Sequence, residues 1–291
     1  MKHAMMIQMH NNVDVVNDTM RMLDDEEITF FILIDSKSKI NKDEFVMPKS
    51  SKVLFLPQRN ILWGHHSQVE AELALLEAAQ NLFQSEKAYF HLMSGADFPL
   101  LKSNEFKQFF DDRYPKEFVR FENKDILNKE RLERIKFYYP TLNVNFPRFF
   151  SRVFVYLSVK IQKTLNVDRM NKKDFPQWIF QSGDNWFSIT NNLASELICH
   201  KEKILYIFKN SRSADELFVQ TILRSSDLYS NVSSDDEGSL RLIDWTRGHP
   251  YTFTDENLSE IINAKKNGAV FIRKLNADSS KGIRNTLLHD K

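Results

Sequence analysis

Ala4-Met5-Met6-Ile7-Gln8-Met9 is an almost continuous apolar run, and the polar triplet His10-Asn11-Asn12 interrupts it. From Val13 to Leu23 the apolar side chains are spaced as on one face of a helix, and Ile28 to Ile34 is a second apolar run that stops at Asp35. Buried strands that alternate with helices are typical of a parallel sheet covered on both faces. The sequence therefore predicts an α/β fold with a Rossmann-like, mostly parallel central sheet and helices on both faces.

The same alternation continues along the chain. Residues 52–56 and 89–93 have the composition of short buried strands, and Ser67 to Phe83 between them has helical spacing, with Glu70 placed as in a capping box. After a less regular middle region, further strands are expected at 183–189, 240–245 and 269–273. Further helices are expected at 149–165, 192–208, 213–223 and 258–265.

Four polar residues stand at or just beyond the ends of predicted elements in the first hundred residues: His10, Asp35, Ser67 and Asp97. Ligands of open α/β sheets bind at the carboxyl ends of the strands, so these side chains are candidates for a binding site. The alternative for each is that aspartate and serine cap helices and turns there. Convergence of several on one edge favours the binding site.

Composition narrows the classes of function. The 291 residues carry a net charge of +1, so no overall field indicates a nucleic-acid partner. The single cysteine, Cys199, rules out an internal disulfide framework and disfavours secretion, and its apolar neighbours predict that it is buried. No targeting signal and no apolar stretch of about 20 residues is present. We therefore expect a cytoplasmic protein, or one peripheral at the inner membrane face.

Metal-binding patterns are absent from the sequence. There is no Asp-x-Asp pair, and the 8 histidines lack metal-site spacing, since His65 and His66 are adjacent. We therefore expect no metal and no cofactor. If the chain handles a phosphorylated substrate, Arg and Lys must stabilise its charge, and Arg247, Arg273 and Lys274 follow predicted strands. The alternative for each is ordinary surface charge.

The segment Ser213-Ala214-Asp215-Glu216 opens a predicted helix. A carboxylate in the first turn of a helix interacts favourably with the helix dipole, so a capping role is the first interpretation. The second is catalytic, because a single ionised glutamate can take the proton from an attacking hydroxyl group.

The region from Phe118 to Phe180 is rich in aromatic and basic residues. Its predicted helix, residues 149–165, carries Arg152, Lys160 and Lys163. Aromatic and basic side chains suit sugar faces and anionic surfaces. An amphipathic helix with a solvated basic face explains the same pattern equally well.

Eight segments, taken together, resemble the core-2/I-branching β-1,6-N-acetylglucosaminyltransferase family, which also includes the protein xylosyltransferases. The most specific is His91–Leu100 (HLMSGADFPL), which resembles the family's LxSGxDFPL motif. The others, in chain order, are His3–Asn12, Ile32–Lys37 (ILIDSK), Trp63–Leu73 (WGHHSQVEAEL), Gly183–Ser188 (GDNWFS), Ser213–Glu216 (SADE), Arg241–Trp245 (RLIDW) and Phe271–Lys274 (FIRK). Their order along the chain is the order found in the family.

The resemblance implies a GT-A fold, an inverting reaction and no metal. It implies that Glu216 is the catalytic base and that Lys274 binds the donor diphosphate, with Arg247 as the nearest candidate for a second cation. On this basis we assign nine residues to the donor side: His10, Asp35, Ser67, Ser94, Gly95, Asp97, Arg247, Arg273 and Lys274. We assign Glu122, Arg131, Arg134, Trp186, Asp215, Asp244 and Trp245 to the acceptor side.

The sequence also departs from the family. Leu33 replaces a histidine, Leu242 stands where many members have a substrate-contacting tyrosine, and Ala214 replaces a proline. The animal members have disulfides and a membrane anchor, whereas this chain has one cysteine and no such anchor, which fits a bacterial relative.

We therefore expect a single GT-A catalytic domain over residues 1–291, with a nucleotide-sugar-binding half (1–115) and an acceptor-binding and catalytic half (116–291). The expected partners are a nucleotide sugar, UDP-GlcNAc above all, and a glycan hydroxyl acceptor in a bacterial surface polysaccharide or glycoconjugate. Two alternatives are open: another donor, UDP-xylose or UDP-glucose, in the same site, or a non-catalytic glycan-binding protein on the same fold. The sequence gives no oligomeric state.

Overall fold

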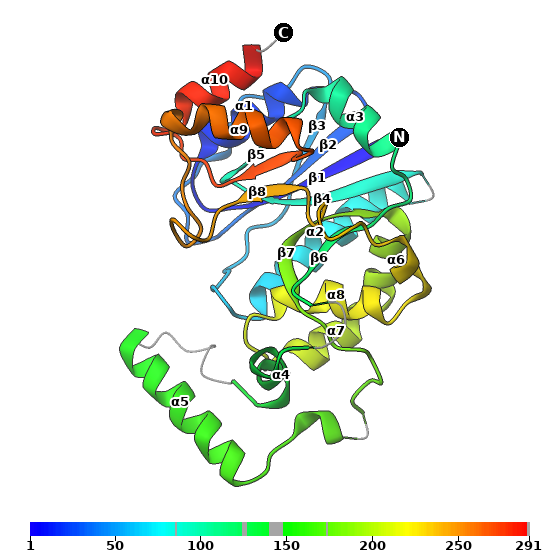
Figure 1. Cartoon of the computed structure of the whole chain (residues 1–291), viewed down its shortest axis with the longest axis vertical. Helices are drawn as coiled ribbons and strands as arrows, with labels where there is room; N and C mark the ends of the chain where they lie inside the picture. Colours follow the sequence, from blue (N-terminus) through cyan, green and yellow to red (C-terminus); the bar gives the residue numbers. More distant parts are fainter. Residues whose placement is uncertain (85, 124–126, 140–147, 173, 290–291) are drawn as a thin grey trace.

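The computed structural model describes residues 1–84, 86–123, 127–139, 148–172 and 174–289, with the backbone alone for 148–152. Its centre is a six-stranded sheet in the order β3-β2-β1-β4-β7-β6 (Figure 1). The first four strands of that order are parallel, and β7 runs antiparallel to both of its neighbours. The strands are β1 Lys2–Met9, β2 Ile28–Ile34, β3 Lys52–Phe55, β4 Ala88–Ser94, β6 Phe118–Phe121 and β7 Gly183–Thr190.

Both faces of this sheet are buried because successive side chains of a strand point to opposite faces. On β1, Ala4 and Met6 belong to one core cluster, whereas Met5 and Ile7 belong to another. The first cluster includes helices α2 (Ser67–Phe83), α6 (Asn191–Cys199), α7 (Lys201–Phe208) and α8 (Phe218–Arg224), and the second includes α1 (Val13–Met22) and α3 (Ser103–Asp111). The predicted α/β class, with a mostly parallel sheet and helices on both faces, is confirmed.

A second, three-stranded sheet joins distant parts of the chain in the order β5-β9-β8. Strand β5 (Asp97–Pro99) follows directly on β4, and it pairs with β9 (Phe271–Arg273), which pairs in turn with β8 (Arg241–Ile243). Helices α9 (Leu258–Lys266) and α10 (Lys281–His289) pack with this sheet and with α1 in a third core cluster. The last third of the chain is thereby brought beside the ends of the parallel strands.

Two helices of the middle region lie below the sheets in Figure 1, namely α4 (Lys129–Lys136) and α5 (Arg148–Thr164). Five short 3₁₀ helices complete the described elements: Lys42–Glu44, Arg169–Asn171, Ala214–Glu216, Asp227–Asn231 and Asp255–Asn257. No helix of the described residues is long and apolar enough to span a membrane.

Four local predictions are wrong. The helix expected over 192–208 is divided into α6 and α7 at His200. Cys199, at the end of α6, is exposed rather than buried. Ser67 does not cap α2, because its hydroxyl oxygen accepts the Leu62 N–H at 2.9 Å and His66 precedes the helix.

The fourth error concerns the segment that carries the candidate base. Ser213 does not cap a continuous helix: its φ is 48°, and its N–H donates to the Gly64 carbonyl at 2.9 Å. Residues Ala214–Glu216 form a 3₁₀ turn, and α8 begins only at Phe218. This contact with the loop before α2 therefore sets the position of Glu216.

Candidate active site

Polar residues collect at the carboxyl ends of the parallel strands. His10 follows β1 and is exposed, Asp35 follows β2 and is 8% exposed, and Ser94 ends β4. Asp35 is held in place by its own loop, since one carboxylate oxygen accepts the Lys37 N–H at 3.0 Å and the other pairs with the Lys37 ammonium at 3.1 Å. Because β2, β1 and β4 are neighbours in the sheet, His10, Asp35 and Ser94 lie at one edge of it.

Asp97 is the centre of the tightest network at this edge. Its side chain is 1% exposed, and its Oδ2 accepts the Ser94 N–H at 2.5 Å. The Arg273 guanidinium donates to Asp97 Oδ1 at 3.1 Å and to the Ser94 hydroxyl at 2.5 Å, and it stacks at 4.2 Å on the ring of Trp186. A buried charge pair with this many hydrogen bonds fixes Arg273 rigidly, because breaking it leaves an uncompensated charge.

Gly95 lets two loops approach closely at the same edge. A Cβ atom at this position would lie 2.8 Å from the Asn11 carbonyl oxygen and 2.9 Å from Met9 Cβ. The Gly95 N–H donates to the Gln8 carbonyl at 3.2 Å. The loop after β4 therefore packs directly on the loop after β1, and a side chain here would push the two apart.

The two cations predicted to bind a diphosphate have different surroundings. Lys274 directly follows Arg273, its backbone pairs with Tyr251 and Phe253, and its side chain is half-buried. No acidic side chain of the described residues pairs with its ammonium group. Arg247, by contrast, is bound by Asp244 and by Glu260, the latter at 2.6 Å, and its guanidinium stacks on Tyr251 at 4.4 Å.

Asp244 and Trp245 belong to the loop after β8. Asp244 accepts hydrogen bonds from the Thr246 N–H at 2.6 Å and the Thr246 hydroxyl at 2.7 Å, and it pairs with Arg247. The Thr246 hydroxyl and then the Arg247 guanidinium lower the pKa of Asp244. Trp245 is 55% exposed. This loop therefore presents an aromatic ring to solvent and keeps its own charges paired.

Glu216 lies in a second group of residues, beside α4. Its Oε2 accepts hydrogen bonds from Arg131 at 2.5 Å and from Arg134 at 2.8 Å, both on α4. Arg131 also donates to Glu122 at 2.8 Å, and Glu122 accepts a further bond from the Ser182 hydroxyl. No described residue donates to Glu216 Oε1, and the side chain is 34% exposed. The carboxylate is thus oriented through one oxygen while the other stays open.

Two further carboxyl groups are buried beside Glu216. Asp215 is 7% exposed and accepts a hydrogen bond from Gln68 at 3.1 Å, and Glu72 is 0% exposed. Burial, and then the neighbouring Glu216 charge, raise the pKa of Asp215 to about 7. Burial, and then Asp215, raise the pKa of Glu72 well above its usual range. Two neighbouring carboxyl groups with little access to water favour their protonated forms, whereas the Glu216 side chain is the exposed member of the three.

This burial predicts how stability depends on pH. A carboxyl group whose pKa is raised on folding stabilises the fold fully below its unfolded pKa, 3.8 for an aspartate, and loses that contribution as the pH rises through about 7. Asp215→Asn should therefore become more stable relative to the wild type between pH 4 and pH 7, by an amount on the order of a few kcal/mol, and the difference should stay constant above that range.

Urea unfolding at a series of pH values measures this difference. Asp278→Asn, at an exposed aspartate, is the control and should follow the wild type throughout. Parallel curves for the wild type and Asp215→Asn would show that Asp215 does not titrate in the folded protein in this range.

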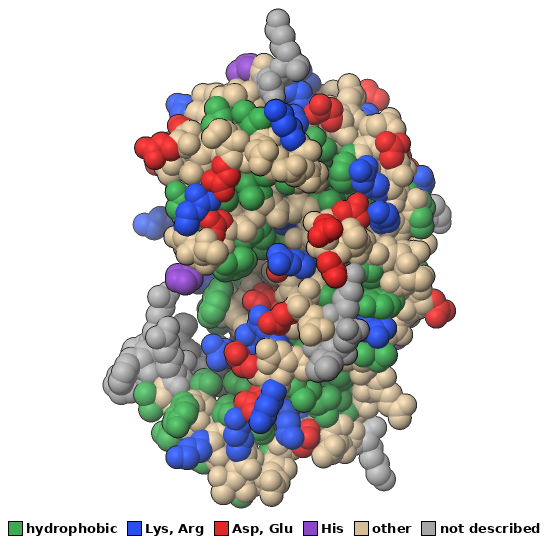
Figure 2. Space-filling view, in the orientation of Figure 1, with side chains coloured by type: hydrophobic (Ala, Val, Ile, Leu, Met, Phe, Trp, Pro, Cys, Tyr) green, Lys and Arg blue, Asp and Glu red, His purple; other side chains and the backbone are tan. Residues whose placement is uncertain are grey.

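Strand β7 connects the two groups of residues. The ring of Trp186 on β7 stacks against the Arg273 guanidinium, and the Ala214–Glu216 turn packs against the same strand. Figure 2 shows the surface hollowed about midway down this face, with acidic and basic side chains around the hollow. Some of the predicted residues thus meet in two groups, Ser94–Asp97 with Arg273 and Trp186, and Glu122, Arg131, Arg134 and Asp215 with Glu216.

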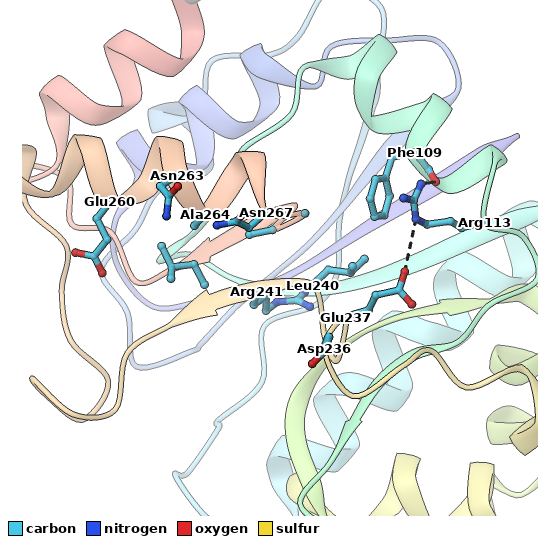
Figure 3. A pocket seen from close by; sticks show the side chains of 13 residues that line it. Phe109, Arg113, Asp236, Glu237, Leu240, Arg241, Glu260, Asn263, Ala264 and Asn267 are labelled. Carbon is cyan, nitrogen blue, oxygen red and sulfur yellow. Dashed lines mark hydrogen bonds and ion pairs between the residues drawn. The ribbon is translucent and has the colours of Figure 1, made fainter.

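The concave surfaces on the described residues include the following two. One, of about 270 Å³, is lined by the predicted acceptor residue Glu122 together with Arg120, Asn123 and Asp235. The larger, of about 560 Å³, lies between α3, β8 and α9 and is lined by none of the predicted site residues. Figure 3 shows Asn263 and Glu260 of α9 on one side of it and the Arg113–Glu237 ion pair on the other.

The sequence missed three residues of the site. Gln68 and Glu72 stand four residues apart on α2 and face Asp215, and a polar i, i+4 pair in an otherwise apolar helix face was the available signal. Arg241 was quoted only as part of a motif, yet its guanidinium donates to the Leu92 carbonyl at 2.6 Å, beneath the Ser94 end of β4.

Among known protein families, the Core-2/I-Branching enzyme family matches residues 4–266, which include Ser94, Asp97, Trp186 and the group around Glu216 but end before Arg273. The chain belongs to this family. It is therefore a glycosyltransferase, and its partners are a nucleotide sugar and a glycan acceptor.

A solved structure shows only weak similarity to the chain. The apo crystal structure of mouse xyloside xylosyltransferase 1 shares 10% sequence identity, covers 96% of this chain and 98% of its own, and has a TM-score of 0.39. No curated protein matches the sequence. Among the described residues, no group of three or more His, Cys, Asp or Glu side chains is placed to hold a metal ion.

Proposed function

We propose that this glycosyltransferase is inverting and metal-independent, and that it transfers GlcNAc from UDP-GlcNAc to a glycan hydroxyl in β linkage. The observation that carries the proposal is the orientation of Glu216, which two arginines hold by one carboxylate oxygen while the other is open. In an inverting reaction one carboxylate takes the proton from the attacking hydroxyl, and the open oxygen of Glu216 is free to accept it.

The donor is proposed to lie across the carboxyl ends of β1, β2 and β4. His10 and Asp35 would face the uridine side, and Asp97 with the Ser94–Gly95 backbone would lie near the donor sugar. As the acceptor oxygen forms its bond to the anomeric carbon, the bond to the diphosphate breaks from the opposite face. The leaving UDP takes the electron pair, and Lys274 would stabilise its charge, with Arg247 as the second candidate.

The acceptor is proposed to approach between α4 and the loop after β8. Glu122, Arg131 and Arg134 supply charged groups for sugar hydroxyls, and the exposed Trp245 supplies an aromatic face. We propose a bacterial surface polysaccharide or glycoconjugate as the acceptor, and a site of action in the cytoplasm or at the inner face of the membrane. The single cysteine supports that location, since secreted enzymes of this size commonly depend on disulfides.

Donor choice is tested by mixing the purified enzyme separately with UDP-GlcNAc, UDP-xylose and UDP-glucose and measuring UDP release with and without glycan acceptors. UDP-GlcNAc should give the largest release. A preference for UDP-xylose or UDP-glucose would contradict UDP-GlcNAc as the donor but would leave the proposed mechanism unchanged. Glycan binding without turnover of any nucleotide sugar would contradict the enzymatic proposal and favour a glycan-binding protein.

Chelation tests the proposed use of basic side chains in place of a metal. We expect the rate of transfer in excess EDTA to equal the rate without it, because Arg and Lys side chains are not removed by a chelator. The measurement is UDP release in EDTA, followed by addition of Mn²⁺ or Mg²⁺ in excess. A loss of activity that either ion restores would contradict metal independence.

A further inference from the structure

Helix α5 presents an apolar stripe to solvent. Val153, Leu157 and Ile161 stand one helical turn apart, and they are 42%, 49% and 58% exposed. Phe154 and Leu165 extend the same stripe at 55% and 68% exposure. Large apolar side chains normally belong to a core, so four of them on one side of a single helix, with Leu165 directly after its end, indicate a surface that another body covers.

The orientation of this stripe is fixed by the other side of the helix. Val155 and Val159 are half-buried, and Gln162 accepts the Tyr138 N–H at 2.8 Å and donates to the Tyr138 carbonyl at 2.9 Å. Lys163 pairs with Glu133 on α4 at 2.7 Å. The helix is therefore attached beside α4 through its polar and half-buried residues, and the apolar stripe points away from the protein. Figure 1 shows α5 at the lower edge of the molecule.

The charges of this segment have one sign. Residues 148–165 include four basic residues, Arg148, Arg152, Lys160 and Lys163, and no aspartate or glutamate. The structure describes the side chains of the two lysines, and Lys160 is exposed beside the apolar stripe. An apolar stripe with a basic flank is the pattern of helices that lie in the interface of an anionic membrane.

The same charges argue against a second copy of the chain as the occupant. A two-fold contact places one patch against itself, so the basic flank of one α5 would face another basic flank. Anionic lipid headgroups supply the opposite charge, and the acyl boundary accepts apolar side chains without a shaped pocket.

We propose that α5 docks the enzyme on an anionic lipid surface, lying flat in the headgroup region with Val153, Phe154, Leu157, Ile161 and Leu165 directed into it. The neighbouring helix α4 carries Arg131 and Arg134, which hold Glu216, so docking would keep the acceptor side of the site close to the lipid. The docking itself does not depend on the proposed reaction. Only the advantage of holding the enzyme near an acceptor at the membrane rests on the proposed function.

Vesicle co-sedimentation of the full chain tests the docking without any measurement of catalysis. The wild type should sediment with phosphatidylcholine vesicles that contain phosphatidylglycerol, and much less with phosphatidylcholine alone. Binding should weaken as salt increases, because the lysine contacts are screened. The variant Phe154→Asp/Leu157→Asp/Ile161→Asp should bind at least about tenfold more weakly, and Lys160→Gln about fivefold.

The control variant Val46→Asp/Met47→Asp changes two side chains that are similarly exposed, 69% and 50%, in a different part of the chain. It should bind as the wild type does. Circular dichroism and thermal unfolding establish that the three-residue variant is folded. Equal binding of that variant and the wild type, or no wild-type binding to anionic vesicles, would overturn the proposal. A wild-type dimer that the variant converts to monomers would assign the stripe to a second copy instead.

A fluorescent dye on α5 reports whether the helix inserts into the membrane. Labelling at one position is straightforward because the chain has a single native cysteine. Phe154→Cys in a Cys199→Ser background, labelled with an environment-sensitive dye, should shift its emission to the blue when anionic vesicles are added. Val46→Cys in the same background should show no shift. Identical responses at the two positions would contradict insertion of α5.

Discussion

Glu216→Gln is expected to lower kcat for sugar transfer by about 10²–10⁴-fold, the usual contribution of a general base. Glutamine keeps an oxygen that can accept the hydrogen bonds from Arg131 and Arg134, so the change removes the charge while preserving shape and contacts. Without a carboxylate, the acceptor hydroxyl must attack with its proton in place. UDP binding, measured by calorimetry, should stay within about twofold of the wild type, because Glu216 is proposed to act on the acceptor and not on the donor.

The chain offers a matched control in Glu130, which pairs with the same Arg134 at 3.6 Å and has a side chain that is 79% exposed. Glu130→Gln should leave kcat within about twofold, since an exposed ion pair contributes little. If Glu216→Gln transferred sugar at the wild-type rate, another group would have to be the base. If it lost UDP binding as strongly as transfer, the residue would act in the donor site.

Lys274→Ala is expected to lower kcat/KM by roughly a hundredfold to a thousandfold, the range seen when one stabilising group is removed from a developing anion. The ammonium group has no acidic partner among the described residues, and it follows Arg273, whose own charge is already neutralised by Asp97. It is therefore available for the leaving diphosphate. Weaker UDP binding should accompany the loss, because product UDP retains the same charge.

Two controls separate this role from general charge. Lys266→Ala removes an exposed lysine of α9 and should have no measurable effect. Arg247→Ala should have a smaller effect than Lys274→Ala, since Asp244 and Glu260 already bind that guanidinium. If Arg247→Ala were the more damaging variant and Lys274→Ala nearly neutral, the diphosphate would be assigned to the loop after β8.

The strand–helix alternation was predictable because an apolar run for a strand and helical spacing of apolar residues for a helix can both be read from a short stretch of sequence. The runs 4–9 and 28–34 are apolar except for Gln8 and Thr29, and such runs are typical of strands that are buried on both faces. The grouping of Ser94, Asp97 and Arg273 was partly predictable too, since strand ends share an edge. The three-stranded sheet that brings residue 273 to residue 97 has no signal in either segment alone.

The errors of prediction arise where a tertiary contact replaces a local preference. Serine favours a helix N-terminus, yet the Ser213 N–H binds the Gly64 carbonyl and the Ser67 hydroxyl binds the Leu62 N–H, so neither caps. Cys199 lies in an apolar run but at the last turn of a short helix, where it faces water. The arginines on α4 were expected near an acceptor, but only the fold places them on Glu216.

The link between Asp97 and Arg273 spans 176 residues of sequence. During synthesis, the four parallel strands leave the ribosome long before β9 does. The Asp97 carboxylate therefore has no contact with Arg273 until nearly the whole chain has emerged. Contacts of such long range form late in folding. A ribosome-bound chain that stopped short of β9 would therefore contain all six strands of the central sheet, but Asp97 would lack Arg273 and the proposed donor site would be incomplete.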